Sequence, residues 1–195
     1  MNKRALILLF AVAAAVLLAG AYAWRTVREH EVEQTVAIGG PFQLTDQDGR
    51  AVDEGVLEGK WSAVFFGFTH CPDVCPGTLQ ALDVAAGQLG PKTKDFQIVF
   101  VGVDSRRDTP EQMKAYLEAQ GLGAGTLGLT GTPGQIAAAA KVYRAYYAVE
   151  GEGDETTVSH SNAIYMMDPK GRFVTPLHYD IPPDQLAGEI REAMG

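Results

Sequence analysis

The sequence has 195 residues, of which 46% are hydrophobic and 21% charged, and its formal net charge is −8. This composition is typical of a folded protein, and the length suits one domain with an additional segment. The acidic balance argues against nucleic-acid binding, which needs a basic surface. Two cysteines are too few for a disulfide-stapled scaffold, a zinc ribbon or an iron–sulfur cluster held by cysteines.

The N-terminal segment, residues 1–25, predicts a transmembrane anchor. Its uncharged run, residues 5–24, is flanked by basic residues on both sides. As a helix this run would be about 30 Å long, which matches the hydrocarbon core of a bilayer. A cleaved secretory signal is the alternative, because Ala21-Tyr22-Ala23 is a usable cleavage site. Both interpretations place the rest of the chain outside the cytoplasm.

Residues 26–40 are mostly polar, contain His30 among glutamates, and end in two glycines. They predict a flexible stalk, followed by a single domain over residues 41–195. In that domain the predicted strands and helices alternate, which indicates an α/β fold around a mixed sheet. The predicted strands form an N-terminal hairpin (42–45 and 51–52), two buried strands (62–68 and 96–103) and a second hairpin (162–167 and 172–175).

Four helices are predicted, two of them from their N-terminal residues. Thr109-Pro110 and Thr132-Pro133 each place threonine at the N-cap and proline at the first helical position, with glutamine three residues after the threonine. The predicted helices cover residues 76–89, 110–121, 133–143 and 183–194.

The two cysteines stand close together, as Cys71-Pro72-Asp73-Val74-Cys75, between the first buried strand and a helix. In a helical turn this spacing points both sulfurs the same way, which suits a disulfide or two thiolates on one metal. The start of a helix also favours the thiolate form. We expect Pro76 to be the first helical residue, with Cys75 at the N-cap and Cys71 in the preceding loop.

Two structural alternatives for the cysteines are open. They can be small hydrophobic residues of the core, although prolines and an aspartate are poor neighbours for that role. They can also form a structural disulfide in an oxidising compartment. So short a loop would constrain the unfolded chain less than a long one. We therefore favour a reactive or metal-binding pair.

A histidine would complete a metal site. Besides His30, the sequence offers His70, His160 and His178. His160 is the favoured ligand because it lies between a polar loop and an apolar strand, where a loop can carry an imidazole over a site built elsewhere. His70 is adjacent to Cys71 and is expected to point away from it. Two thiolates and an imidazole suit Cu(I), can hold Cu(II), and do not exclude Zn(II).

Three sequence blocks carry a resemblance to a known family. The cysteine block covers residues 66–76, a second block, Val101-Gly102-Val103-Asp104-Ser105-Arg106-Arg107-Asp108-Thr109-Pro110-Glu111, follows the second buried strand, and the third begins at His160-Ser161 and ends near residue 173. In order and spacing they resemble the Sco (SenC/PrrC-type) family of copper-binding assembly proteins, over essentially all of residues 41–194.

The resemblance implies a thioredoxin-like domain, anchored in the bacterial inner membrane by one N-terminal helix and lying in the periplasm. It implies one copper, as Cu(I) or Cu(II), bound by Cys71, Cys75 and His160. It also implies a role in assembling the binuclear copper centre of cytochrome c oxidase, with the copper-bearing subunit of that enzyme and an upstream copper donor as partners. Ser159 departs from the family, which often has aspartate before the metal histidine. We assign Asp104, Arg107 and Asp108 to loop structure.

Three functions are compatible with these residues. A copper metallochaperone would need both cysteines and His160. A thiol–disulfide oxidoreductase would use Cys71 and Cys75 as its redox-active pair, would keep the partner's copper-ligating cysteines reduced, and would not need His160. A peroxidase of the peroxiredoxin kind is disfavoured, because the residues before Cys71 do not match its active-site motif. The metallochaperone is the principal hypothesis and the oxidoreductase the alternative.

Overall fold

The computed structural model describes residues 15–22, 24, 38–122, 125–151 and 156–195. The chain divides into two compact units, Met1–Ala37 and Ile38–Gly195. Most of the predicted anchor and stalk, including His30, lies outside the described residues. Within the described part, we find no helix that is both long enough and apolar enough to cross a membrane.

The domain is built on a mixed sheet of seven strands in the order β2-β1-β5-β4-β3-β8-β9. The three central strands, β3, β4 and β5, run parallel to one another. Each strand outside them pairs antiparallel with its inner neighbour. The α/β class predicted from the sequence is therefore confirmed. The strands are β1 (Gln43–Asp46), β2 (Ala51–Asp53), β3 (Trp61–Gly67), β4 (Phe96–Gly102), β5 (Thr126–Thr130), β8 (Ile164–Met167) and β9 (Phe173–Leu177).

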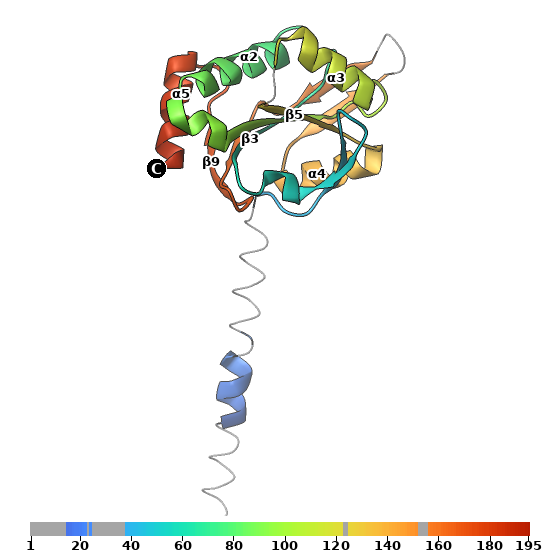
Figure 1. Ribbon diagram of the computed structural model, residues 1–195. Coiled ribbons are helices and arrows are strands. Elements are labelled where there is room, and N and C mark those ends of the chain that lie inside the picture. The colour runs from blue at the N-terminus through green and yellow to red at the C-terminus, as the bar shows by residue number, and fades with distance from the viewer. Residues whose placement is uncertain (1–14, 23, 25–37, 123–124, 152–155) are drawn as a thin grey trace, which may run out of the picture. The chain divides into compact units, whose positions relative to one another are not determined.

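Helices cover both faces of the sheet, with α2, α3 and α5 on one face and α4 on the other (Figure 1). The connections β3-α2-β4 and β4-α3-β5 step across the sheet in the same direction, so right-handed crossovers place α2 and α3 on the same side. Helix α5 then packs beside α2. The helices are α2 (Val74–Gly87), α3 (Pro110–Ala119), α4 (Pro133–Tyr143) and α5 (Pro183–Met194), with short 3-10 turns η1 (Glu54–Leu57) and η2 (Gly90–Asp95).

The threonine N-caps predicted for α3 and α4 are confirmed. Thr132 and Gln135 form a full capping box at α4, and the Thr109 side chain accepts a hydrogen bond from the Gln112 amide at α3. Strands β3 and β4 are buried along almost their whole length, as their uninterrupted apolar sequences predict. Strand β5 was not predicted from the sequence, because it is short and Gly128 interrupts its apolar residues.

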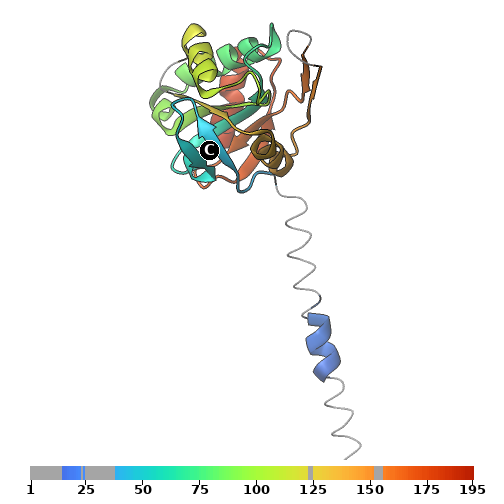
Figure 2. The same ribbon diagram turned by 90° about the vertical axis from the view of Figure 1, so that its right-hand side faces the viewer.

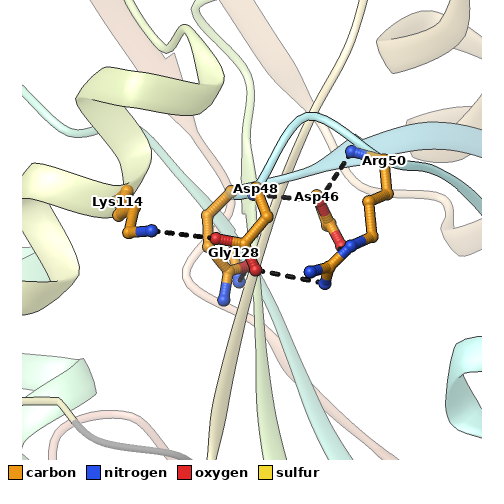
Figure 3. Close-up of polar contacts among 6 residues, drawn as sticks. Asp46, Asp48, Arg50, Lys114 and Gly128 are labelled. Carbon is orange, nitrogen blue, oxygen red and sulfur yellow. Dashed lines mark hydrogen bonds and ion pairs between the residues drawn. The ribbon is translucent and has the colours of Figure 1, made fainter.

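The predicted N-terminal hairpin is present as β1 and β2, and its turn attaches it to the rest of the domain (Figure 3). The Asp46 carboxylate accepts hydrogen bonds from the amides of Asp48 and Arg50, which closes the turn. Asp48 then pairs with Lys114 of α3, at 3.0 Å. The turn therefore connects the edge of the sheet to a helix that follows it by more than sixty residues in the chain.

A second, two-stranded sheet consists of β6 (Tyr147–Glu150) and β7 (Thr157–His160), and it lies beside the main sheet in Figure 2. The polar segment expected from Glu150 to Thr157 runs from the last residue of β6 to the first residue of β7. The expectation that a loop carries His160 was wrong, because His160 is the last residue of β7 and pairs with Tyr147 of β6. The two strands are short and only half buried, so they lack the apolar alternation by which a strand is recognised.

Gly128 allows α3 to pack directly on β5. A Cβ atom built at Gly128 would lie 2.8 Å from Cδ1 of Leu117 and closer still to Met113, and both are residues of α3. We expect Gly128→Ala to lower the free energy of unfolding by about 1–3 kcal/mol, the usual cost of overpacking a core. Urea denaturation measures this loss. Gly188→Ala, in α5 with no atom near the added methyl, is the control and should not destabilise the domain.

Candidate metal centre

Three chain connections meet where β3 and β4 end. Gly67 and Gly102, the last residues of these parallel strands, pair in register, so the loops that follow leave the sheet side by side. Strand β8 runs antiparallel to β3 and begins at Ile164, opposite Phe65, so the segment that precedes β8 reaches the same edge. Ligand sites of α/β proteins form at this edge, beyond the carboxyl ends of parallel strands.

Cys71, Cys75 and His160 come together at this edge. Their ligand atoms all lie within 4.8 Å of one another, and Cys75 Sγ is 3.4 Å from His160 Nε2. In the described part of the chain this is the one group of three such side chains placed to hold a metal ion. Both cysteines are free thiols. Two sulfurs and one nitrogen form a soft ligand set, of the type that Cu(I) prefers.

Helix α2 begins earlier than the sequence suggested. Its first residue is Val74 and its N-cap is Asp73, so Cys75 lies inside the first turn rather than at the cap. Pro76 is accommodated because amides in the first turn have no acceptor within the helix. Cys71 is in the preceding loop, as predicted, and its Sγ accepts a hydrogen bond from the Cys75 amide, at 3.4 Å. The first turn of α2 therefore faces the Cys71 sulfur.

The two thiols differ in exposure. Cys75 is fully buried, whereas Cys71 is half-buried. Burial raises the pKa of the Cys75 thiol well above its ordinary value, because the thiolate would lose its hydration. At neutral pH Cys75 therefore keeps its proton in the metal-free protein, and it must release that proton to become a metal ligand.

The imidazole of His160 is held with its Nε2 toward Cys75. Its Nδ1 lies 3.0 Å from the Ser161 carbonyl oxygen, which can only accept a hydrogen bond, so Nδ1 is the donor of this bond and Nε2 is the ring nitrogen directed at the site. The rings of Phe65 and Phe68 pack edge-on against the imidazole, each with a centroid distance of 5.8 Å. Ser159 stands where the family resemblance led us to consider an aspartate, and the orienting hydrogen bond of the imidazole goes instead to a backbone carbonyl.

The other described histidines lie outside this group. Nδ1 of His70 is 3.1 Å from Oγ1 of Thr69, as expected for a residue that points away from Cys71. His178 is exposed, and its Nδ1 is 2.6 Å from Oε1 of Glu189.

The sequence interpretation missed the contribution of Asp108. This residue was assigned to loop structure, but its buried carboxylate contacts Thr69, two residues before Cys71. Asp104 and Arg107 do form a local ion pair within the loop, in agreement with the structural role expected for them. The residues around Asp108 give no local sign of this contact. It follows from the register of β3 and β4, which places the loop of Asp108 beside the cysteine loop.

Gly67 provides the space for Cys75. A Cβ atom at Gly67 would lie 2.7 Å from Cys75 Sγ and 2.8 Å from Cε2 of Phe100. We expect Gly67→Ala to displace the sulfur and to weaken metal binding by about tenfold or more, as changes that misplace a ligand do. A chelator-competition titration measures the affinity. Gly77→Ala, in the same helix as Cys75 with free space around the added methyl, should bind metal like the wild type.

The chain is similar in sequence to proteins of one family. The family model described as SCO1/SenC matches residues 30–195. Protein SenC of Rhodobacter capsulatus is 37% identical over 194 residues, which covers 93% of this chain and 87% of the relative.

The solved structures similar to the domain include two with copper bound. Bradyrhizobium japonicum ScoI with copper bound has a TM-score of 0.72 and 40% identity, covering 80% of this chain and 99% of that one. Arabidopsis thaliana ScoI with copper bound has a TM-score of 0.74 and 37% identity, covering 81% of this chain and 98% of that one. They confirm the thioredoxin-like α/β fold expected from the resemblance. The chain belongs to the SCO1/SenC family.

Proposed function

We propose that this protein is a copper metallochaperone that binds one copper through Cys71, Cys75 and His160. The observation that carries the proposal is the convergence of two sulfurs and one imidazole nitrogen within 4.8 Å, although His160 follows Cys75 by 85 positions in the chain. The copper in the two similar solved structures supports the choice of metal.

Three protein ligands leave room for an incoming ligand. A thiolate or imidazole of a partner can then bind the copper before Cys71, Cys75 or His160 releases it, and no free ion is formed. Cys71 is the more accessible sulfur, so the exchange begins on its side of the site. We propose the copper-bearing subunit of cytochrome c oxidase as the receiver, for its binuclear copper centre, and an upstream copper protein as the donor.

Copper transfer tests this proposal directly. The copper-loaded full chain is mixed anaerobically with the metal-free copper domain of the oxidase subunit, the two proteins are separated, and copper is counted in each. We expect copper to move to the oxidase domain even in the presence of a chelator that holds free copper tightly. Loss of transfer whenever such a chelator is present would contradict delivery by ligand exchange.

The alternative function, thiol–disulfide oxidoreductase, is supported by the different exposure of the two thiols. Cys71 is half-buried whereas Cys75 is fully buried, so Cys71 is the sulfur that can reach a partner's disulfide. It would form a mixed disulfide with the partner and release one partner thiolate, after which Cys75 would attack Cys71 and release the second. The partner gains two electrons and this protein ends as the Cys71–Cys75 disulfide. A variant without His160 should keep this activity and lose copper transfer.

We propose that residues 1–25 anchor the protein in the bacterial inner membrane, with residues 26–40 as a stalk and residues 41–195 as the copper-binding domain in the periplasm. The uncharged run of residues 5–24, flanked by basic residues, supports this arrangement. The mass of the protein isolated from membranes tests it. A mature chain that begins after Ala23 would show a cleaved signal instead.

A further inference from the structure

Asp108 is a fully buried carboxylate that connects two loops at the site. Its Oδ1 accepts hydrogen bonds from the backbone amide of Thr69, at 2.9 Å, and from the Thr69 hydroxyl, at 2.8 Å. Its Oδ2 accepts from the backbone amide of Asp104, at 3.1 Å. Burial raises the pKa of Asp108, while the hydrogen bonds from Thr69 favour the carboxylate.

Thr69, the residue that Asp108 holds, lies between the Phe68 ring and Cys71 in the candidate metal centre. Phe68 precedes Thr69, and its ring packs against the imidazole of His160. The Phe68 carbonyl oxygen accepts a hydrogen bond from the amide of Cys71, at 3.2 Å. A fixed Thr69 therefore fixes both the aromatic wall beside His160 and the turn that places Cys71.

A buried carboxylate is a costly way to join two loops. Taking its charge out of water is unfavourable unless every hydrogen bond is made. The strand pairing of Gly67 with Gly102 already brings the two loops together without it. The hydrogen bonds of Asp108 add a defined position for Thr69, which apolar packing would leave less well determined.

We propose that Asp108, acting through Thr69, is a positioning residue. It holds Cys71, and the Phe68 ring that packs against His160, in the geometry that binds copper. The inference rests on the proposed copper-binding function and assigns no metal contact to Asp108. Loss of the carboxylate frees the cysteine loop, so that the three ligands no longer hold one geometry.

Two threonines provide a matched test, because both are buried and both donate a hydroxyl hydrogen bond to Asp108. Thr69 bonds to the carboxylate, whereas Thr130 bonds to the backbone carbonyl oxygen. Thr69→Val and Thr130→Val each remove one hydroxyl of the same kind. A merely structural role for Asp108 predicts similar consequences for the two variants, whereas a positioning role predicts that only Thr69→Val changes the copper site.

The experiment compares the full-length wild type with Asp108→Ala, Asp108→Asn, Thr69→Val and Thr130→Val. Copper affinity is measured by chelator competition, and ligand geometry by the sulfur-to-Cu(II) charge-transfer absorption. We expect affinity to fall by about tenfold or more in Asp108→Ala, and by less in Asp108→Asn and Thr69→Val, with altered spectra. Thr130→Val should stay within about twofold of the wild type with an unchanged spectrum.

Amide hydrogen exchange in the metal-free chain gives a second readout. In Asp108→Ala the amides of Thr69 and Cys71 should exchange faster, while amides of β4 keep their protection. Should Asp108→Ala fail to fold, Thr69→Val and Asp108→Asn still decide the question. Wild-type affinity and spectrum in Thr69→Val and in every folded Asp108 variant would overturn the proposal. A wild-type protein that binds no copper would overturn the proposed function itself, a result distinct from a copper-binding wild type with unaffected variants.

Discussion

His160→Ala is expected to weaken copper binding by more than tenfold, or more than about 1.4 kcal/mol, while the two cysteines still pass between dithiol and disulfide. The substitution removes the one nitrogen ligand of the proposed site, but it touches neither sulfur. The loss follows from the geometry, since Nε2 lies 3.4 Å from Cys75 Sγ and is fixed there by the hydrogen bond at Nδ1.

Copper affinity is measured by chelator competition, and the dithiol by counting free thiols in glutathione buffers of different potential. His178→Ala is the matched control, because His178 is exposed, lies outside the group of three and should bind copper like the wild type. Wild-type affinity in His160→Ala would contradict the three-ligand site. Loss of dithiol cycling in the same variant would show that His160 also serves the redox chemistry.

Cys71→Ser and Cys75→Ser are each expected to abolish both stoichiometric copper binding and the cycling of the cysteine pair between dithiol and disulfide. A single remaining thiolate with His160 cannot close a three-ligand site, and no intramolecular disulfide can form. Copper per chain after gel filtration and thiol counts under oxidising conditions measure the two losses. One retained copper in either variant would place the site elsewhere in the chain.

The two serine variants should differ in stability. Cys75 is fully buried, so a serine hydroxyl there lacks water and should cost about 1–3 kcal/mol of unfolding free energy. Cys71 is half-buried, and Cys71→Ser should stay near the wild-type stability. Denaturant titration separates this structural effect from ligand loss, and Cys71→Ser is therefore the cleaner test of copper binding.

Much of the fold follows from local sequence patterns. The apolar runs of β3 and β4, the capping residues of α3 and α4, and the Asp-Gly turn of the first hairpin each mark a structure that neighbouring residues determine. The elements that were missed depend on distant partners. Strand β5 is completed by β4 and β1 on its two sides, and β7 exists only because β6 pairs with it.

The candidate site divides in the same way. The cysteines stand four residues apart, so their proximity could be predicted from spacing alone. His160 was selected from its sequence surroundings and the family resemblance, and its approach to Cys75 depends on the antiparallel entry into β8. The contact of Asp108 with Thr69 depends on the register of β3 and β4, which no local pattern encodes.

An anaerobic titration of the reduced full chain with Cu(I) tests the central claim most directly, with free thiols counted before and after. Tight binding should end at one copper per chain, and both thiols should lose their reactivity together, because Cys71 and Cys75 bind the same ion. No tight copper, or one tight copper that leaves both thiols reactive, would contradict a copper site built from these cysteines.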